Sequence, residues 1–387
     1  MIKINVFNYP ILQGRKPIIK FNLKILFILE YYYPNVGGIE KLFKELAEAL
    51  VKEKHEVMVL TNRYEKTLES EEIINGVRVK RVHLKNRFFF SFFSLPTVLK
   101  HARNFDLIHT TSYNAALPVS LAGAFLNKKV IITFHEVWGN LWFKLPFMNR
   151  FQKTLFYLYE KLILKLPFNT FIAVSDSTKQ NLISHRIASQ KIIRIYNGIE
   201  YKSSDKEEAK ASKKNTFTFL GRLGVSKGLD ILIPAAGQFV KEYPEAIFQI
   251  LSPDNSKTIQ RKVENLIRKH HLEKNVNWFT NLGSLQVEEK LLSSNCMIIP
   301  SYSEGFCFVA AEAIALKIPI ISSGKGALQE VVSGKFIKME TFDSEGIYQS
   351  LVKAKNEEYE ITPIKKFHFQ DTLEAYLKLY QSICTSK

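Results

Sequence analysis

The chain has 387 residues, a length that predicts two domains. Hydrophobic residues make up 46% of it and charged residues 24%, which is typical of a soluble globular protein. Its net charge of +17 favours an anionic partner, which can be nucleic acid, an anionic lipid or a phosphorylated small molecule. Nucleic acid is disfavoured, because no nucleic-acid-binding motif occurs and the Lys and Arg residues are spread along the chain. An acidic membrane surface fits better, and a generally basic surface stays open as the alternative.

Apolar runs, the N-terminus and the cysteines all favour a cytosolic protein. The longest apolar runs, Phe88–Leu99 and Ala115–Phe134, contain polar residues and fall short of the roughly 18 apolar residues of a membrane span. The N-terminus lacks the ordered regions of a signal peptide. The three cysteines, Cys296, Cys307 and Cys384, have no metal-ligand spacing and form no disulfide framework.

The first half of the chain alternates short runs rich in Ile, Val and Phe with helical patterns, which predicts parallel strands joined by crossover helices. Residues 1–22 precede the first strand and are either an extra strand or a loose arm. Helices are expected at Gly38–Glu53 and Arg150–Lys165. The expected strands are Lys24–Glu30, Glu56–Thr61, Val77–His83, Asp106–Thr110, Val130–Phe134, Thr170–Val174 and Ile192–Tyr196.

A segment dense in Lys, Ser, Asp and Glu, Tyr201–Asn215, has the composition of a linker. A second alternating series follows, and Phe367–Ile383 reads as a final amphipathic helix. The expected strands of this series are Thr216–Gly221, Ala246–Leu251, Asn275–Phe279, Cys296–Pro300 and Pro319–Ser322. The expected helices are Lys227–Glu242, Ser256–His270, Leu285–Ser293 and Val309–Leu316. Each half is thus a doubly wound sheet, and a ligand is expected in a cleft at the carboxyl ends of both.

Two strand ends carry residues suited to a phosphate. Gly37 and Gly38 follow the first strand and open a helix, where glycines allow close backbone approach and free N–H groups attract an anion. A plain turn explains the same pair about as well. Arg222 and Lys227 follow the first strand of the second half, between glycines, and together suit a diphosphate, with a solvated basic loop as the alternative.

A pair of carboxylates is the most specific signal. Glu304 lies on a loop after a strand, and Glu312 lies eight positions later, about one turn into a helix. Both are expected to face the same cleft, where helix amides suit phosphate and carboxylates suit hydroxyl groups. Without the strand, loop and helix that surround them, two Glu at such a spacing would indicate no binding site.

These features together resemble the retaining glycosyltransferases of the GT-B fold, in the large family four that includes sugar transferases of cell-surface glycan assembly. The resemblance spans residues 24 to about 340 and rests on motifs in the family's order. They are Gly37–Gly38, His135–Glu136, Asn197–Gly198, Gly221–Arg222–Leu223 with Lys227–Gly228, and the Glu304-to-Glu312 pair. The resemblance implies an α/β fold of two Rossmann-like, doubly wound parallel-sheet domains with an interdomain cleft. Residues 1–200 would form the acceptor-binding domain and 201–366 the donor-binding domain, with the helix at about 367–387 packing back on the first.

Site roles follow from the resemblance. The expected catalytic residues are His135, Glu304, Arg222 and Lys227: Arg222 and Lys227 would hold the diphosphate, Glu304 and His135 the donor sugar. Glu312 would accept hydrogen bonds from the donor ribose, and backbone amides around Phe306–Val309 and at Gly38 would contact the phosphates. A lone histidine at a strand end is more often structural, but its place in the motif order favours a role in the site. The other expected donor-binding residues are Gly37, Asn197, Gly221, Gly305, Phe306, Phe308 and Val309.

The implied reaction is hexosyl transfer from a UDP- or GDP-sugar to a glycan or lipid-linked acceptor, with retained configuration. Same-face attack is favoured over a double displacement through Glu304. No metal or other cofactor is expected, since the metal-binding Asp-x-Asp motif is missing. An epimerase of the same fold and a non-catalytic sugar-nucleotide-binding protein are the rival functions. A phosphorylase-like enzyme is disfavoured, because it needs a pyridoxal-binding lysine in a much longer chain.

Three features depart from the family's pattern. Cys307 and Ala327 stand where glycine is usual, which puts the donor sugar or its pose in question. The third is the aromatic region Trp138–Phe143, which belongs to a set of aromatic and basic residues in the first half. That set predicts peripheral contact with an anionic membrane, with an ordinary buried core as the alternative. Its members are Phe88, Phe89, Phe90, Phe92, Phe93, Trp138, Trp142, Phe143 and Phe147, near Lys85, Arg87, Lys144, Arg150 and Lys153.

Overall fold

A computed structural model describes residues 22–35, 37–84, 87–201, 215–253 and 257–385. The expected arm or extra strand falls almost wholly at residues 1–21, and the expected linker at 202–214, so both lie outside the described residues. Lys85 and the side chain of Arg87 lie outside them too.

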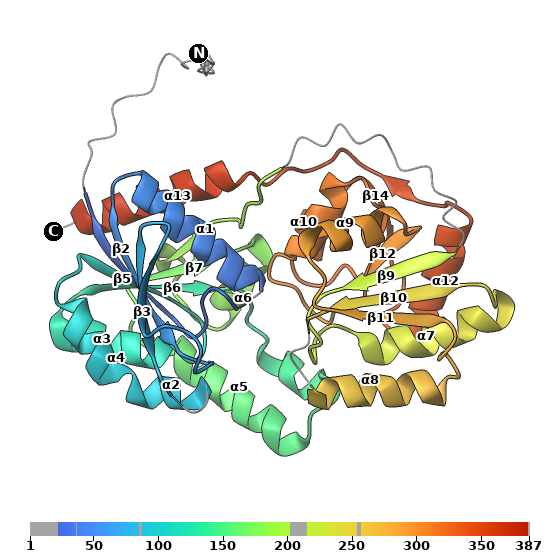
Figure 1. The fold of residues 1–387 in the computed structure, drawn as a ribbon, viewed down its shortest axis with the longest axis horizontal. Helices are drawn as coiled ribbons and strands as arrows, with labels where there is room; N and C mark the ends of the chain where they lie inside the picture. Colours follow the sequence, from blue (N-terminus) through green and yellow to red (C-terminus); the bar gives the residue numbers. More distant parts are fainter. Residues whose placement is uncertain (1–21, 36, 85–86, 202–214, 254–256, 386–387) are drawn as a thin grey trace, which may run out of the picture.

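The described chain forms two sheets side by side (Figure 1). The first has the strand order β3-β4-β2-β1-β5-β6-β7-β8 and is parallel except for the β3–β4 pair. Its strands are β1 Lys24–Leu29, β2 Glu56–Asn62, β3 Glu71–Ile74, β4 Val77–Val82, β5 Leu107–Thr111, β6 Lys129–Phe134, β7 Thr170–Ala173 and β8 Ile192–Arg194. Its helices are α1 Gly38–Lys52, α2 Arg87–Phe93, α3 Leu95–Ala102, α4 Ala116–Leu126, α5 Arg150–Leu164 and α6 Asp176–Ser184, with 3₁₀ turns η1 Gly139–Lys144 and η2 Ser189–Lys191.

The second sheet has the order β11-β10-β9-β12-β13-β14-β15 and is parallel except for the β14–β15 pair. Its strands are β9 Thr216–Leu220, β10 Ile247–Ser252, β11 Val276–Thr280, β12 Cys296–Ile299, β13 Ile320–Ser322, β14 Lys335–Lys338 and β15 Glu360–Ile361. The helices that follow are α7 Leu229–Glu242, α8 Lys257–Lys269, α9 Ser284–Leu292, α10 Phe308–Ala315, α11 Leu328–Val331, α12 Ser344–Lys355 and α13 Phe369–Thr385. The predicted fold class, two α/β domains built on largely parallel sheets, is confirmed.

The predicted strands all occur, with ends shifted by one or two residues, whereas the antiparallel edge strands were missed. The β3–β4 hairpin turns at Asn75 and Gly76, which have φ values of 49° and 85°. Asn-Gly between apolar alternations is a strong hairpin signal, so the sequence did carry the information for this pair. The short strands β14 and β15 and the helices α11 and α12 have no comparably distinct pattern.

The last helix, α13, returns to the first sheet. Its residues Phe369, Leu373, Tyr376 and Tyr380 are buried in the same apolar cluster as Phe27 of β1. The Tyr380 hydroxyl lies 2.6 Å from Nδ1 of a buried histidine of β5, His109. In Figure 1 α13 accordingly lies beside α1, across the molecule from the strands that precede it in the chain.

Candidate functional site

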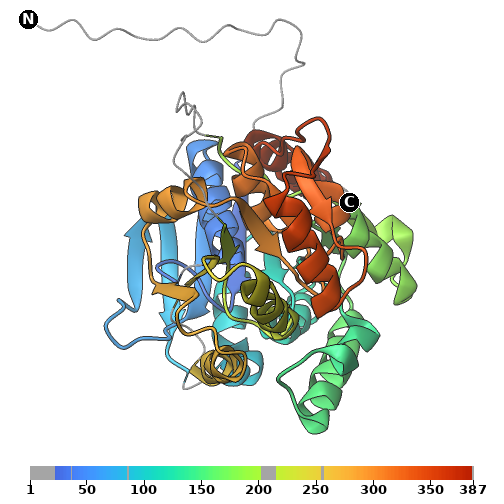
Figure 2. The same cartoon turned by 90° about the vertical axis from the view of Figure 1, so that its right-hand side faces the viewer.

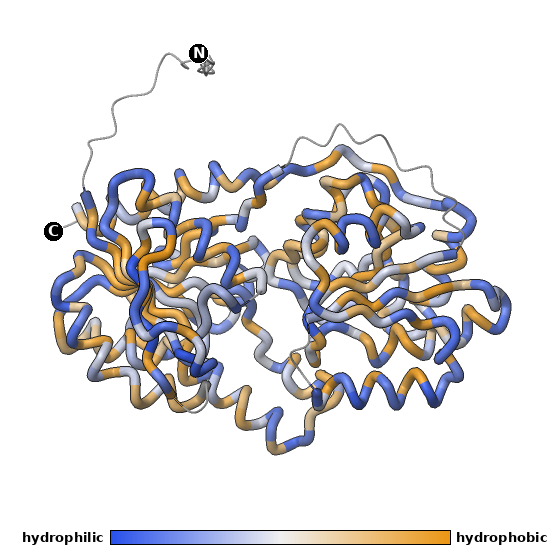
Figure 3. The backbone as a smooth tube through the Cα atoms, viewed as in Figure 1, coloured by the Kyte–Doolittle hydropathy of each residue, from blue (hydrophilic) through white to orange (hydrophobic). Residues whose placement is uncertain are grey.

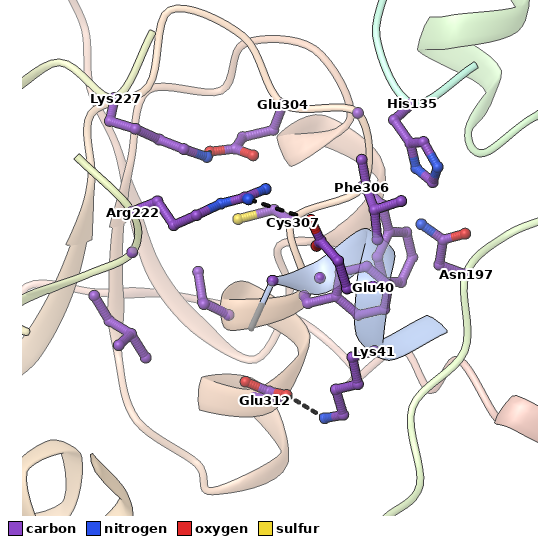
Figure 4. A pocket seen from close by; sticks show the side chains of 18 of the residues that line it. Glu40, Lys41, His135, Asn197, Arg222, Lys227, Glu304, Phe306, Cys307 and Glu312 are labelled. Atoms are coloured by element: carbon purple, nitrogen blue, oxygen red, sulfur yellow. Dashed lines mark hydrogen bonds and ion pairs between the residues drawn. The ribbon is translucent and has the colours of Figure 1, made fainter. Parts of the chain in front are cut away.

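One cavity of about 520 Å³ lies between the two sheets, at the carboxyl ends of their strands. Its lining comes from the loops after β1, β6, β9 and β12 and from the starts of α1 and α10. All thirteen residues predicted for the site line it: Gly37, Gly38, His135, Asn197, Gly221, Arg222, Lys227, Glu304, Gly305, Phe306, Phe308, Val309 and Glu312. Figure 4 shows three cationic side chains that each face an acidic one in the cavity: Lys227 faces Glu304, Arg222 faces Glu40 and Lys41 faces Glu312.

Glycine is required at two of these positions by close contact between the domains. A Cβ added to Gly305 would lie 1.6 Å from the backbone oxygen of His135, so the loop after β12 touches the loop after β6 through backbone alone. A Cβ on Gly38 would lie 2.6 Å from the ring of Phe308, so the start of α1 packs on the start of α10. The two halves of the site are therefore in direct contact.

Lys227 and Glu304 form a partly buried ion pair. The Lys227 Nζ lies 2.7 Å from Glu304 Oε1, and the hydroxyl of Ser301 donates to the same oxygen at 2.6 Å. Burial acts to lower the pKa of Lys227, but the Glu304 carboxylate together with Cys307 and Glu136 raises that pKa above the ordinary value. Lys227 thus stays charged, and the ion pair fixes the loop after β12 to the loop before α7.

Two further ion pairs cross the cleft between the domains (Figure 4). Arg222 NH1 lies 3.6 Å from Glu40 Oε1, and Lys41 Nζ lies 3.0 Å from Glu312 Oε1. Glu40 and Lys41 are consecutive residues in the first turn of α1. Neither residue was predicted to belong to the site, although Glu40 follows Gly37, Gly38 and Ile39 in the chain.

His135 and Glu136 lie at the end of β6 with shifted protonation. Burial, aided by the Arg222 charge, lowers the pKa of His135 to about 3, so its imidazole is neutral at physiological pH. Burial, followed by the Glu304 charge, raises the pKa of Glu136 to about 7. Glu136 also lines the cavity and was missed as a site residue; its position next to His135 was the available signal.

The two departures from the family's glycines differ in backbone conformation. Cys307 has a φ of 75°, in the left-handed region that favours glycine, and it directly precedes α10. Ala327 has a φ of −70° and is fully buried, so its backbone does not require glycine. Burial, followed by the Glu304 charge, raises the pKa of the Cys307 thiol well above its usual range, so it stays protonated.

The predicted aromatic set divides between core and surface. Phe90 and Trp142 are buried, and Phe147 packs against the core of the second domain, so the membrane-facing interpretation is wrong for these three. Their rings fill space inside the fold, where the apolar surface is removed from water. The exposed members are Phe88, Phe89, Phe92, Phe93 and Phe143.

Comparison with known proteins gives the same family for both halves of the chain. The profile of Glycosyltransferase Family 4 matches residues 36–202, and that of Glycosyl transferases group 1 matches residues 200–354. A relative, the gpi3 subunit of phosphatidylinositol N-acetylglucosaminyltransferase from Schizosaccharomyces pombe, is 24% identical over 92% of this chain and 80% of its own length.

Solved structures share the fold at low sequence identity. Sucrose-phosphate synthase from Thermosynechococcus elongatus superposes with a TM-score of 0.73 at 18% identity, covering 94% of this chain and 100% of that one. Anabaena HepE in complex with UDP and glucose superposes with a TM-score of 0.70 at 16% identity, covering 93% and 100%. The chain belongs to glycosyltransferase family four, with the GT-B fold.

Proposed function

We propose that this family-four glycosyltransferase is a retaining hexosyltransferase that uses a UDP- or GDP-sugar. Its acceptor would be a glycan or a lipid-linked glycan of cell-surface polysaccharide or glycolipid assembly. The observation that carries the proposal is that Arg222, Lys227, Glu304 and Glu312 line one interdomain cavity. In this proposal residues 1–200 bind the acceptor and residues 201–366 bind the donor.

The roles of the charged residues follow from the groups on a sugar nucleotide. Arg222 and Lys227 bind the diphosphate and offset the negative charge that develops on it as the sugar leaves. Glu312 accepts hydrogen bonds from the ribose hydroxyls, and Glu304 accepts them from the donor sugar. Because these two cations supply the charge that a metal provides in other transferases, the proposal includes no divalent ion.

Uncharged groups of both domains complete the site in this proposal. The amides at Gly38 and around Phe306–Val309 point to the phosphates in this proposal, with Gly37, Gly221 and Gly305 keeping the loops close. His135, neutral because burial lowers its pKa to about 3, exchanges hydrogen bonds with the donor sugar. Asn197 contributes a buried amide oxygen that has no hydrogen-bond partner among the described residues and can accept one from the substrate.

Retention is proposed to arise by attack on the face from which the diphosphate departs. The acceptor oxygen forms its bond to the anomeric carbon as the bond to the diphosphate oxygen breaks, and the acceptor proton passes to that phosphate. A covalent intermediate on Glu304 is the less favoured alternative; Glu304 Oε1 is bound to Lys227 and Ser301, which leaves Oε2 to face the donor sugar in this proposal.

The relatives support the choice of substrates without identifying them. The gpi3 subunit belongs to an enzyme named for N-acetylglucosamine transfer to phosphatidylinositol, which supports an N-acetylhexosamine donor and a lipid acceptor. The HepE complex contains UDP and glucose, which supports a uridine nucleotide.

Thermal unfolding with UDP- and GDP-sugars tests the donor, because a ligand that binds only the native state raises the melting temperature. Transfer from the stabilising donor is then measured in wild type, Arg222→Ala and Glu304→Ala, with EDTA present, and the product anomer is read by NMR. We expect a retained anomer and a loss of transfer of about 100-fold or more in both variants. An inverted product, or equal activity in the folded variants, would contradict the proposal.

A non-catalytic sugar-nucleotide-binding protein and an epimerase remain the rivals, and the same assay separates them. Binding without turnover on any lipid or glycan acceptor favours the binding protein. Conversion of the donor to its epimer without transfer favours the epimerase.

Peripheral membrane contact at the cytoplasmic face is part of the proposal. An apolar stripe on α5, made of Phe151, Leu155, Leu158 and Leu162, is exposed to solvent, and Arg150, Lys161 and Lys165 lie among it. Apolar side chains flanked by cations suit an anionic bilayer surface. None of the helices that the structure describes is long and apolar enough to span a bilayer.

A further inference from the structure

Glu40 is a buried carboxylate with an incomplete set of partners in the donor cavity. It is the third residue of α1 and is only 6% exposed. Its Oε1 accepts a hydrogen bond from Asn35 Nδ2 at 3.2 Å and lies 3.6 Å from Arg222 NH1. Its Oε2 is buried and has no hydrogen-bond partner among the residues that the structure describes. Since a buried carboxylate without compensation is costly, Arg222 is the group that balances it.

Gly37 is the reason that the two groups can meet. A Cβ on Gly37 would lie 2.2 Å from Glu40 Oε2 and 3.0 Å from Arg222 NH1. The φ of Gly37 is −175°, an extended conformation open to any residue, so the backbone does not require glycine there. What the position requires is empty space between a carboxylate of the first domain and a guanidinium of the second.

The ion pair is asymmetric, and this asymmetry suggests which partner positions the other. The Glu40 side chain is 7% exposed, lies on helix α1 and accepts a hydrogen bond from Asn35. The Arg222 side chain is 44% exposed and belongs to the loop after β9. A guanidinium has five N–H donors, so Arg222 can face Glu40 with one edge and still offer others to a diphosphate.

We propose that Glu40 is a positioning residue that holds the Arg222 guanidinium, across the domain interface, in the orientation that binds the donor diphosphate. The inference rests on the proposed function, because it assigns the diphosphate to Arg222. Fixing the side chain before the donor arrives removes an entropic cost from binding. Since the two residues belong to different domains, the cationic site is complete only when the domains are closed.

Lys41 extends the same arrangement to the ribose end of the site. It pairs with Glu312, but these side chains are 49% and 38% exposed, so the contact is a weak one. The first turn of α1 thus contacts both ends of the proposed nucleotide site, and Glu40 is the buried residue of the two.

The test uses Glu40→Gln, which keeps the shape of the side chain and removes its charge. UDP and GDP are each titrated by calorimetry, and the kinetic constants for donor and acceptor are measured with the full chain. We expect a rise of about tenfold in the Kd of the nucleotide that binds and in the donor KM, with smaller changes in kcat and in the acceptor KM. Gly37→Ala, which blocks the approach without removing a charge, should shift the donor KM in the same direction.

Glu56→Gln is the control for the loss of a paired carboxylate outside the site. Glu56 lies at the start of β2, at the amino ends of the strands and away from the cavity, and it pairs with Lys24 at 3.2 Å. It should leave both nucleotide Kd and donor KM unchanged. In an Arg222→Ala background, Glu40→Gln should add no further loss, since the two residues act as one unit.

Unchanged or tighter nucleotide binding in Glu40→Gln would overturn the inference, as would losses that simply add in the double variant. These outcomes differ from failure of the proposed function. If Arg222→Ala itself binds nucleotide and donor as well as wild type does, the diphosphate assignment is wrong; if only Glu40→Gln is silent, the positioning role is wrong.

Discussion

Two helices lie on the same side of the molecule, α5 of the first domain and α8 of the second. Helix α8 exposes its polar face to solvent, whereas α5 exposes an apolar one. The buried residues of α8 are Ile259, Val263 and Ile267, spaced so that its apolar side faces the sheet and its charged side faces water. On α5 the exposed side chains include Phe151, Leu155, Leu158 and Leu162, which also share one helix face. Figure 3 shows the contrast in hydropathy between the two helices, and α5 projects from the lower margin in both Figure 1 and Figure 2. The first domain therefore has an exposed apolar face, which is unfavourable in water and is typical of a surface that contacts a membrane or a partner.

The same two domains also differ inside the cleft. The second domain supplies charged side chains at the ends of its strands, among them Arg222, Lys227 and Glu304. The first domain supplies glycine backbone, a neutral histidine, the buried carboxyl groups of Glu40 and Glu136 and one partly exposed cation, Lys41. In the proposed function this difference corresponds to a division of labour, in which one domain binds the charged donor and the other closes the site and faces the acceptor.

The strongest way to break this division is to hold the domains apart. In Gly305→Ala the new Cβ would overlap the His135 oxygen, so the two loops must separate. Because a displacement of about 1 Å in a reacting site can cost a factor of about 100, we expect transfer to fall by at least about that factor. Nucleotide binding to the second domain should fall much less. Equal losses of binding and transfer would show that the domains are not divided in this way.

The outer face of the first domain gives the second prediction. Leu155→Ser with Leu158→Ser should lower binding to anionic vesicles by about tenfold or more, because each buried Leu contributes about 1.5–3 kcal/mol. Co-sedimentation at two salt concentrations measures the change. The matched control is Leu285→Ser in the second domain, where Leu285 is 72% exposed on α9. Equal binding by both variants and wild type would remove the proposed membrane contact.

The third prediction concerns the protonation of Glu136. Since burial raises its pKa from 4.5 to about 7, the folded protein keeps a proton that the unfolded chain has already lost. The stability from this neutral form is full below the unfolded pKa and is lost as pH rises through about 7. The melting temperature of wild type should therefore fall more than that of Glu136→Gln between about pH 5 and 8. Parallel curves would mean that Glu136 is ionised throughout, and Glu56→Gln should follow wild type.

The sequence predicted the second domain's part of the site better than the first domain's, for a physical reason. Charged residues at the ends of parallel strands, such as Arg222 and Glu304, are visible in the pattern because topology alone brings strand ends together. Glu40 and Glu136 acquire their properties from burial against the other domain, which no local pattern reports. The apolar stripe of α5 was likewise missed, because its 3.6-residue period is the same whether the face is buried or exposed.

Only some of the aromatic residues of the first domain that were predicted to face a membrane are exposed, because burial is decided by the fold. Composition and neighbouring charges identified the region of exposed apolar surface but only some of its members, namely Phe88, Phe89, Phe92, Phe93 and Phe143. Phe90 and Trp142 are core residues, while Phe125 of α4, which is 69% exposed, was not considered. Tertiary packing decides which side of a helix faces the sheet. The sequence pattern alone therefore cannot predict which aromatic residues are buried.

The smallest expected effect tests the backbone of the loop before α10 at Cys307. Because its φ of 75° strains any residue with a Cβ, Cys307→Gly should be more stable than Cys307→Ala by about 0.5–1 kcal/mol. Ordinarily alanine is the more stable of the two, so the order itself is diagnostic. Ala327→Gly is the counterpart: Ala327 has a negative φ of −70° and a buried methyl group, so glycine there should lower the stability by adding backbone entropy to the unfolded chain and leaving a small cavity. Urea unfolding midpoints measure both. If Cys307→Ala proves the more stable variant, the loop relaxes without cost, and the donor side of the cleft is less rigid than its ion pairs suggest.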